Sequence, residues 1–333
     1  MMKSTAATVC VIIAAKNASG TISRAIRSAL QDRMVAEVVV VDDGSTDDTS
    51  GKAMAEEDGT GRLRVLRLET NRGPAFARNH AIAHSAAPFL AILDADDFFL
   101  NGRFRRLFQH QEWDLIADNI VFVDRQDSLS EPDVCSFEAA PRMLGLAEFI
   151  LGNISKRGAK RGELGFLKPV IRRDFLERTG LRYNEQMRLG EDYELYVRAL
   201  AKGARYKIIH DCGYAAVIRP DSLSGQHRTE DLRHLHEADR ALLSLPCLTV
   251  EARSALRRHE RNVASRYALR HFLDVKKANG IGRAGVHALK SPASLPAIIG
   301  GIAVDKFDAL TGRSHSHAVG PVPRYLLPGQ TAD

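Results

Sequence analysis

Over its first hundred residues, the chain alternates short apolar runs with stretches in which apolar residues recur at helical spacing. Apolar, often β-branched runs bounded by polar turns are typical of buried strands. Four such runs lie at 8–14, 37–41, 63–68 and 89–93. The stretches between them, such as 22–30, carry the pattern of amphipathic helices. The order βαβαβαβ therefore predicts a parallel, doubly wound sheet joined by right-handed crossovers.

Two of the predicted helices carry signals at their start. Asp47 and Asp48 are expected in the first turn of the second helix, where acidic side chains complement the helix dipole. Pro74 is expected near the first position of the third helix, which continues over 75–86. Polar loops therefore precede these helices at the carboxyl ends of the strands.

The pattern is less regular after residue 98. We expect helices over 102–111 and 144–151, and strands over 113–123, 166–171 and, as one strand or two, 206–217. The polar, proline-containing stretch 124–142 predicts a loop, and the basic, glycine-rich stretch 156–162 predicts a mobile segment. A helix over 191–200 is indicated by apolar residues at helical spacing.

The last third of the chain has a different pattern. Apolar residues at helical spacing, with arginines between them, predict helices over 229–245 and 250–277. From Pro292 onward, proline, glycine and Ser-His repeats predict a poorly ordered tail. We therefore expect a sheet domain over 1–222, a helical lobe over 223–290 and the tail over 291–333.

Composition limits where the protein acts. Its 44% hydrophobic and 26% charged residues are ordinary for a globular protein. The cysteines are too scattered for a C-x-x-C zinc site or a disulfide framework, so we expect a reducing compartment. The first apolar run is too short for a signal peptide, and no stretch approaches the ~20 apolar residues of a membrane span. We expect the chain to stay on the cytosolic side.

The net charge of +6 is unevenly distributed. The stretch 226–290 holds 13 Lys or Arg and 7 Asp or Glu, so the surplus lies in the predicted lobe. Such a surface could face nucleic acid, anionic lipid or solvent alone. No RRM, zinc-finger or other nucleic-acid signature accompanies it, so we do not expect nucleic acid as a partner.

Carboxylates gather where two of the predicted strands end. Asp94, Asp96 and Asp97 follow the fourth strand, and Asp42 and Asp43 follow the second. Burying a carboxylate without a partner costs several kcal/mol, so these groups are expected at the ligand-binding edge of the sheet. Oxygen ligands at this spacing suit Mg²⁺ or Mn²⁺, which also bind phosphate oxygens. The alternative is a solvated acidic turn.

Other phosphate-binding patterns are missing from the sequence. There is no G-x-G-x-x-G after the first strand and no G-x-x-x-x-G-K-[ST], which argues against a dinucleotide or P-loop site. A haloacid-type phosphatase would carry its Asp pair after the first strand. A further acidic pair, Glu191 and Asp192, lies at the start of a predicted helix, where it could be catalytic or could simply cap the helix for ~1 kcal/mol.

Taken together, five motifs resemble those of family 2 inverting glycosyltransferases with the GT-A fold. They are VIIAAKN (11–17), VVVVDDGSTDDT (38–49), NRGPAFARN (71–79), LDADD (93–97) and GEDYELYVR (190–198). The resemblance covers about the first two-thirds of the chain, in the family's order. In finer detail, 162–183 is similar to bacterial exopolysaccharide glucosyltransferases, in particular those of succinoglycan synthesis. The resemblance implies a Rossmann-like, mostly parallel α/β sheet flanked by helices, with 1–222 as the catalytic domain.

The resemblance also implies roles on the donor side. The backbone of Ala14, Ala15, Lys16 and Asn17 would line the nucleotide pocket. Lys16 stands where family members often carry an aromatic residue, so it could reach a phosphate instead of stacking on uracil. Asp43 would accept the uracil N3–H. These roles imply a UDP-sugar as the donor.

The remaining roles concern the phosphates and the acceptor. Gly73 and Arg78 would lie near the base and the phosphates. Asp94, followed by Ala95, would contact the ribose or the metal, and Asp96 would hold the divalent cation. Asp97 could replace either carboxylate, because adjacency does not decide which oxygen reaches the site. Asp192 would be the general base, with Glu191 a less favoured candidate.

The implied reaction is a single displacement, in which an acceptor hydroxyl attacks C1 of the sugar, glucose being favoured, while the nucleotide diphosphate leaves. The chain lacks the Q-x-x-R-W motif and membrane helices of processive synthases, which predicts addition of one sugar per encounter. A polyprenyl-diphosphate-linked oligosaccharide is the implied acceptor. The basic lobe and the apolar stretch 295–304 could then rest on the inner face of an anionic membrane.

Two other functions remain open from the sequence. A sugar nucleotidyltransferase shares a related sheet but carries a glycine-rich loop after the first strand, which 14–17 lacks. A non-catalytic nucleotide-sugar or glycan-binding protein could retain a GT-A-like sheet, although intact Asp43, Asp96 and Asp192 argue against that. Neither the donor sugar nor the acceptor linkage can be assigned from these residues.

Overall fold

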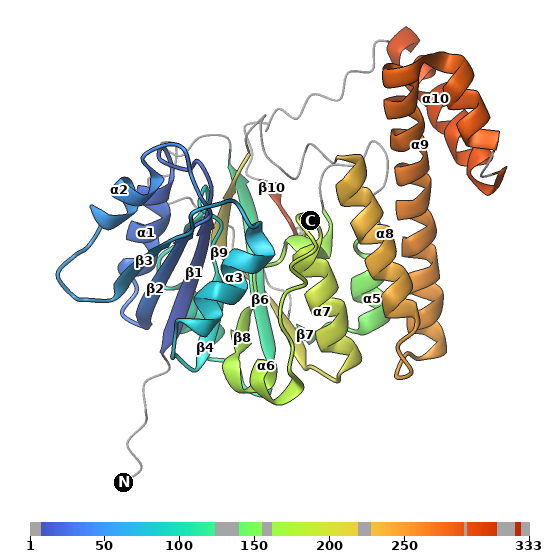
Figure 1. Ribbon diagram of the computed structural model, residues 1–333. Coiled ribbons are helices and arrows are strands. Elements are labelled where there is room, and N and C mark those ends of the chain that lie inside the picture. The colour runs from blue at the N-terminus through green and yellow to red at the C-terminus, as the bar shows by residue number, and fades with distance from the viewer. Residues whose placement is uncertain are drawn as a thin grey trace.

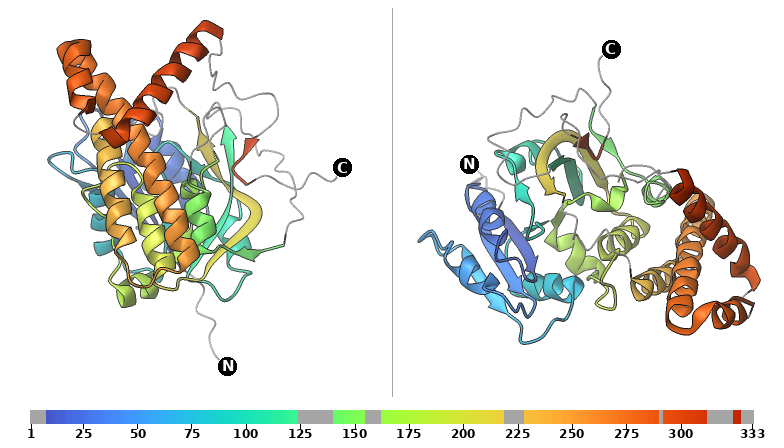
Figure 2. Two further views of the ribbon diagram at one scale, coloured as in Figure 1. Left: turned by 90° about the vertical axis from the view of Figure 1, so that its right-hand side faces the viewer. Right: turned by 90° about the horizontal axis from the view of Figure 1, so that it is seen from above.

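The computed structural model describes residues 8–123, 140–154, 162–218, 228–289, 292–311 and 324–327 (Figure 1). Within them, one mixed sheet has the strand order β3-β2-β1-β4-β8-β6-β9-β5, with β10 paired to β6 and β7 paired to β9. The helices α8 and α9 stand as a separate bundle beside α7 and α5 (Figures 1 and 2).

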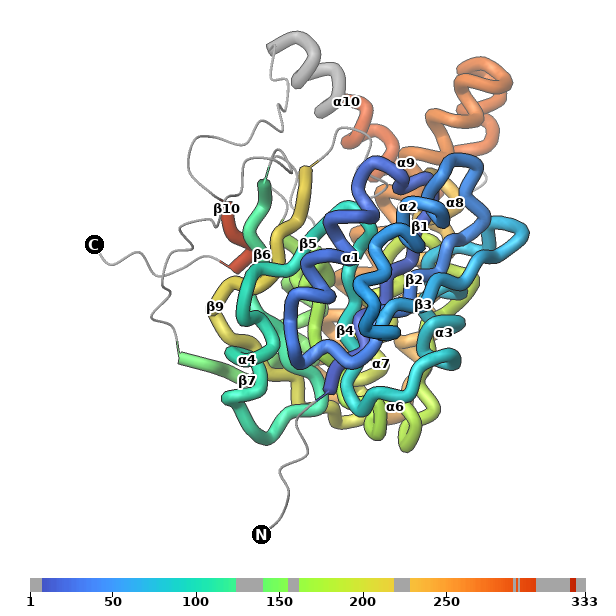
Figure 3. The backbone as a smooth tube through the Cα atoms, turned by 90° about the vertical axis from the view of Figure 1, so that its left-hand side faces the viewer, coloured from blue at the N-terminus to red at the C-terminus, as the bar shows by residue number. Residues whose placement is uncertain are grey.

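The first half of the sheet is parallel, as the sequence predicts. Its elements are β1 (Val9–Ala15), α1 (Ile22–Leu30), β2 (Val35–Asp42), α2 (Thr49–Met54), β3 (Leu63–Arg67), α3 (Pro74–Ala83) and β4 (Phe89–Ile92). The β-branched run of β1 is buried on both faces because helices cover both sides of the sheet. Right-handed crossovers put α1 and α2 on one face and α3 on the other (Figures 1 and 3).

The second helix begins later than predicted. It starts at Thr49, so Asp48 occupies the N-cap position and Asp47 precedes the helix. The Asp47 carboxylate accepts hydrogen bonds from the backbone N–H groups of Ser19 and Thr49, each at 3.1 Å. Asp47 therefore joins the loop after β1 to the loop after β2, and neither aspartate lies within the first turn.

The second half of the sheet introduces antiparallel pairs. Its elements are β5 (Phe98–Phe99), α4 (Arg103–Leu107), β6 (Leu115–Val123), β7 (Arg142–Met143), α5 (Leu146–Leu151), β8 (Val170–Arg172), α6 (Arg173–Thr179), α7 (Glu191–Ala201) and β9 (Tyr206–Val217). The short strand β8 lies antiparallel between β4 and β6, whereas β6 and β9 are parallel. Most paired residues still belong to parallel pairs.

Several predicted boundaries in this half are wrong. The strand expected over 166–171 begins only at Val170, because Leu164–Phe166 forms a turn of 3-10 helix. Arg142, expected in a loop, lies in β7, and the helix expected from residue 144 begins at Leu146. Of the predicted loop over 124–142, residues 124–139 lie outside the described residues. Of the predicted mobile segment over 156–162, only residue 162 is described.

The helical lobe consists of α8 (Thr229–Leu243) and α9 (Val250–Leu289). Helix α9 continues beyond residue 277, where the sequence predicts its end, and it has a break at Gly280, where φ is +81°. Leu232, Leu235 and Leu242 of α8 are buried, which fixes the apolar face that the sequence pattern indicates.

The tail is more ordered than the sequence predicts. Leu295–Thr311 forms α10, and Arg324–Tyr325 forms β10, which pairs antiparallel with β6. The Asn119 side chain donates to Leu327 O at 3.0 Å and accepts from Leu327 N at 2.8 Å. Leu326 and Leu327 are buried in the main core, so the chain returns to the sheet. The predicted limits 1–222, 223–290 and 291–333 stay predictions.

Within the described residues, no helix combines the length and apolar character needed to cross a bilayer.

Candidate active site

Strand register places the predicted site residues at one edge of the sheet. Ala15 of β1 lies opposite Asp42 of β2, so the loops after these strands face each other. Ile12 of β1 lies opposite Ile92 of β4, so the turn that begins near Asp94 emerges at the same edge. The carboxyl ends of parallel strands are where open α/β sheets bind ligands.

The loop after β1 is fixed to the loop after β2. Asn17 N donates to Ser45 Oγ at 2.9 Å, and Asn17 Oδ1 accepts from Thr46 N at 2.9 Å. The exposed Lys16 ammonium donates to the carbonyl oxygen of Gly44. The backbone over 14–17 is therefore held in place for a ligand, while a phosphate contact by Lys16 stays a prediction.

Asp43 is buried and held by backbone groups. Its two carboxylate oxygens accept hydrogen bonds from Arg72 N at 2.6 Å and from Gly73 N at 2.8 Å. Gly73 precedes α3 with a φ of +94° and a ψ of 161°, a conformation that essentially only glycine adopts. Each carboxylate oxygen can accept more than one hydrogen bond, so a base N–H can still be read by Asp43.

Arg78 is buried between the two acidic sites. Its guanidinium donates to Asp94 Oδ1 at 3.0 Å and to Glu191 Oε1 at 2.6 Å, and Nη1 lies 3.5 Å from Asp192 Oδ1. Burial lowers the pKa of Arg78, but the carboxylates of Asp192 and Glu191 raise it well above its usual value. Arg78 thus joins the turn after β4 to the start of α7, and its predicted phosphate contact stays a prediction.

Lys168, which the sequence analysis did not select, lies in the same cluster. Its buried ammonium is 2.9 Å from Asp94 Oδ2 and 2.9 Å from Asp192 Oδ2. Burial lowers the pKa of Lys168, but Asp192 and Asp94 raise it further than burial lowers it. A lysine within the apolar stretch 166–171 was the one sequence signal for this position.

The acidic members of the cluster differ in their surroundings. Burial raises the pKa of Asp94, but Lys168 and Arg78 lower it to about 2, so this group is ionised. For Glu191, burial raises the pKa more than Arg78 lowers it. Asp192 Oδ1 accepts no hydrogen bond from any residue that the structure describes, although it is buried. The two oxygens of the candidate base are therefore held differently, Oδ2 by a hydrogen bond from Lys168 and Oδ1 by the ion pair with Arg78.

The side chain of Asp97 is bonded to β9. It is buried and accepts hydrogen bonds from the Tyr214 hydroxyl at 2.7 Å and from Val217 N at 2.9 Å, both in β9. Burial and the charges of Asp96 and Asp94 raise its pKa well above the usual value. Asp97 therefore ties the turn to β9, and its expected role as a replacement for either neighbour stays a prediction.

The turn after β4 suits a divalent cation. Asp94 and Asp96 supply hard oxygen donors on either side of buried Ala95. The described residues hold no group of three His, Cys, Asp or Glu side chains that could bind a metal. Mg²⁺ and Mn²⁺ commonly use one or two carboxylates together with phosphate oxygens of a substrate, so the two aspartates fit a cation that binds with a nucleotide diphosphate.

A buried polar cluster fixes α7 against the helical lobe. The Tyr193 hydroxyl donates to Asp239 Oδ1 at 3.1 Å, and His259 Nδ1 lies 2.7 Å from Asp239 Oδ2. These residues come from α7, α8 and α9. The lobe therefore supports the helix whose first turn carries Glu191 and Asp192.

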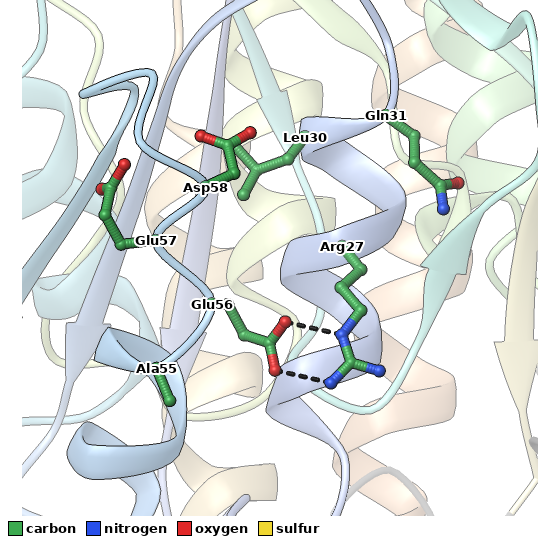
Figure 4. Close-up of a pocket in the computed structure, with 7 residues that line it drawn as sticks. All are labelled: Arg27, Leu30, Gln31, Ala55, Glu56, Glu57 and Asp58. Carbon is green, nitrogen blue, oxygen red and sulfur yellow. Dashed lines mark hydrogen bonds and ion pairs between the residues drawn. The ribbon is translucent and has the colours of Figure 1, made fainter.

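A surface hollow of about 370 Å³ lies away from this edge, between α1 and the end of α2 (Figure 4). None of the predicted site residues lines it. It is lined by Arg27, Leu30, Gln31, Ala55, Glu56, Glu57 and Asp58. The Arg27–Glu56 ion pair at 2.6 Å lies in its wall.

Comparisons with known proteins show what the chain is similar to. Residues 10–149 match the family described as Glycosyl transferase family 2. The chain is 60% identical over 299 residues to the succinoglycan biosynthesis protein ExoU of Rhizobium meliloti (strain 1021), covering 90% of this chain and 87% of that one. It is 37% identical over 116 residues, 34% of this chain and 44% of the other, to the UDP-Glc:alpha-D-GlcNAc-diphosphoundecaprenol beta-1,3-glucosyltransferase WfgD of Escherichia coli.

A solved structure supports the fold. The chain superposes on residues 1–349 of S. aureus TarS in complex with UDP-GlcNAc with a TM-score of 0.59 and 22% sequence identity. The superposition covers 88% of this chain and 79% of TarS. This similarity confirms the GT-A fold predicted from the sequence.

Proposed function

The chain belongs to glycosyl transferase family 2, and from this premise we propose that it moves one sugar from a UDP-sugar, glucose being the first candidate, to a hydroxyl of a growing exopolysaccharide oligosaccharide. Family membership makes it a glycosyltransferase, so the non-catalytic and nucleotidyltransferase alternatives are set aside. The similarity to a succinoglycan biosynthesis protein supports the product class. The name of the E. coli relative supports UDP-glucose and an acceptor linked to a polyprenyl diphosphate.

One observation carries the proposal. Two acidic sites that lie about a hundred residues apart in the chain meet at one sheet edge, where Arg78 contacts Asp94 and Glu191 and lies 3.5 Å from Asp192. Transfer of a sugar with inversion needs a donor site and a base that face each other across the sugar. The cluster supports such a pair with Asp94 and Asp96 on the donor side and Asp192 on the acceptor side.

On the donor side, the chain holds the nucleotide. The backbone of 14–17 lines the pocket, and Asp43 accepts the uracil N3–H while Arg72 N and Gly73 N keep its carboxylate in place. Lys16 is close enough to the same loops to reach a phosphate. Asp96, with Asp94, would hold Mg²⁺ or Mn²⁺, which when bound offsets the negative charge that grows on the diphosphate.

On the acceptor side, Asp192 takes the proton. The acceptor oxygen forms its bond to C1 as the bond from C1 to the diphosphate oxygen breaks, and the hydroxyl proton passes to Asp192. A positioned base of this kind contributes about 10²–10⁴-fold to a rate. Lys168 holds this carboxylate through Oδ2, and Arg78 Nη1 lies 3.5 Å from Oδ1.

The helical lobe is the candidate membrane contact. Ile281 and Leu289 of α9 and Ile299 of α10 are exposed, and the basic surplus of 226–290 lies in the lobe. Apolar and basic residues together favour the surface of an anionic membrane, where the lipid-linked acceptor would be found. Co-sedimentation with anionic vesicles at low salt, and its loss at high salt, is the expected result. Equal recovery without vesicles would contradict the contact.

The function is tested by UDP release from a panel of UDP-sugars with Mn²⁺, without and with polyprenyl-diphosphate-linked oligosaccharides. We expect release from UDP-glucose that rises with the acceptor and is lost in Asp96→Ala and on chelation. Asp211→Asn, an exposed aspartate outside the site, is the matched control and should behave as wild type. Absence of UDP binding, measured by calorimetry, would contradict the proposal at its first step.

A further inference from the structure

The Lys168 ammonium bridges one oxygen of Asp94 and one oxygen of Asp192. Resting on the proposed function, we propose that Lys168 is a positioning residue, which holds the Asp192 carboxylate in place through its Oδ2 oxygen. It is nine-tenths buried, with a relative exposure of 7%. A charged side chain is rarely buried to this degree unless it is paired, and here both partners belong to the candidate site.

The contacts of Lys168 make the two oxygens of Asp192 unequal. Its ammonium donates to Asp192 Oδ2 at 2.9 Å, while Oδ1 accepts no hydrogen bond from the described residues. Oδ1 is buried and lies 3.5 Å from Arg78 Nη1, which is also bonded to Glu191 at 2.6 Å, and the Tyr183 hydroxyl interacts with the same carboxylate. Lys168 and Arg78 therefore hold different oxygens of Asp192.

The same ammonium also fixes the separation of the two sites. It lies 2.9 Å from Asp94 Oδ2, and Arg78 takes Asp94 Oδ1. The turn after β4 and the first turn of α7 are thus joined by two cations instead of one. Without Lys168, Asp94 and Asp192 would repel each other across the space it leaves, and Asp192 would turn toward Arg78, its remaining cation.

The backbone of Lys168 is held by a buried arginine. Arg103 Nη2 donates to the carbonyl oxygen of Lys168 at 2.6 Å. Arg103 is itself held by Asp118, with Nη2 at 2.8 Å from Oδ1, and both are buried. A Cβ on Gly213 would lie 2.3 Å from Asp118 Oδ2, so the pair also requires glycine there. This buried support fixes the backbone from which the ammonium reaches the two carboxylates.

A double-mutant cycle distinguishes a positioning residue from a merely structural one. Lys168→Met keeps the length of the side chain and removes its charge. We expect UDP release from UDP-glucose to fall about 100-fold, in the range of a lost general base. Because the effect passes through Asp192, the double variant Lys168→Met/Asp192→Asn should be no slower than Asp192→Asn alone. The affinity for UDP, measured by calorimetry with and without Mn²⁺, should change by less than about threefold.

A chemical rescue keeps the test independent of how well the Met variant folds. Lys168→Cys, treated with 2-bromoethylamine, regains an ammonium at nearly the original distance, and at least one-tenth of the lost activity should return. Cys247 is exposed and would also react, so the experiment uses a Cys247→Ser background, with the same background carrying Lys168 as the treated control.

Three outcomes would overturn the inference. They are wild-type activity in Lys168→Met, losses that multiply in the double variant, and a loss of UDP affinity as large as the loss of rate. The last two would mean that Lys168 acts on the donor directly. A different result, full activity in Asp192→Asn, would refute the proposed base itself, so the two failures are distinguishable.

Discussion

Two carboxylates of the candidate site, Asp43 for the nucleotide base and Asp192 for the acceptor, are held by different means. On the donor side, Asp43 is held by the backbone N–H groups of Arg72 and Gly73. On the acceptor side, Asp192 and Glu191 are held by the side chains of Lys168 and Arg78, which come from elsewhere in the chain. A backbone support needs only the local loop conformation, whereas a cationic support needs the whole sheet to be assembled. The acceptor side should therefore be the more sensitive to loss of a single side chain.

The largest effect is expected from Arg78→Met, which removes a buried cation from three carboxylates. Breaking a buried ion pair by removing one partner typically costs about 3–5 kcal/mol of unfolding free energy. Urea unfolding should show a loss in this range, together with loss of UDP release. Arg105→Met, which replaces an exposed arginine of α4, is the control and should leave both unchanged. A smaller loss of unfolding free energy in Arg78→Met than in Asp43→Asn would contradict the greater sensitivity expected of the acceptor side.

Asp43→Asn should have a smaller effect on stability and a specific effect on the nucleotide. The amide can no longer accept at both oxygens, so one backbone N–H loses a charge-assisted hydrogen bond worth about 1.5–3 kcal/mol. The preference for UDP over CDP should also fall toward one, because a carboxylate no longer reads the N3–H. Calorimetry with both nucleotides measures this ratio, and an unchanged ratio would rule out Asp43 as the uracil contact.

Gly73→Ala sharpens the donor side of the comparison. The φ of +94° and ψ of 161° cost an alanine about 1–3 kcal/mol, and the loop that holds Asp43 would shift. We expect lower stability and weaker UDP binding together. Gly59→Ala also has a positive φ, of +79°, but lies away from the site, so it should lower stability without weakening UDP binding. Equal UDP affinity in both variants would show that the loop does not position Asp43.

The smallest expected effect is a change in stability with pH, which arises from the contacts that Asp47 makes between two loops. Hydrogen bonds from Thr49 and Ser19 outweigh the effect of burial and lower the pKa of Asp47 to about 2. Because the folded-state pKa lies below the unfolded value, the stability from Asp47 is present above about pH 4 and is lost as pH falls toward 2. Thermal melting should show Asp47→Asn less stable than wild type at pH 6, with the gap closing near pH 2. A gap that stays constant would contradict this account.

The sequence predicts the donor side well because its signals are local. Apolar runs of β1, β2 and β4 define the strands, and the acidic residues that follow them define the edge. The acceptor side is harder to predict from the sequence. Lys168 looks like a single charge within an apolar stretch, and Arg103 is one of three arginines in Arg103–Leu107. Only the assembled sheet brings Lys168 to Asp94 and Arg103 to Asp118.

Two further features lie beyond a pattern-based prediction for the same reason. Asp96 and Asp97 are adjacent and chemically identical, and only the register with β9 shows that Asp97 bonds to Tyr214. The short strand β10 follows a stretch rich in proline and glycine, so its pairing with β6 depends on a space that exists only in the assembled sheet. Long-range pairing decides both, and neither has a local signature.

The most direct test of the account is the rate of UDP release by Asp192→Asn, measured with its UDP affinity in the same preparation. The account predicts a rate lower by about 10²–10⁴-fold, because the base is lost. It also predicts an unchanged UDP affinity, because the donor loops are held separately by Asp43 and the backbone. Release at the wild-type rate, or a loss of UDP affinity equal to the loss of rate, would contradict it.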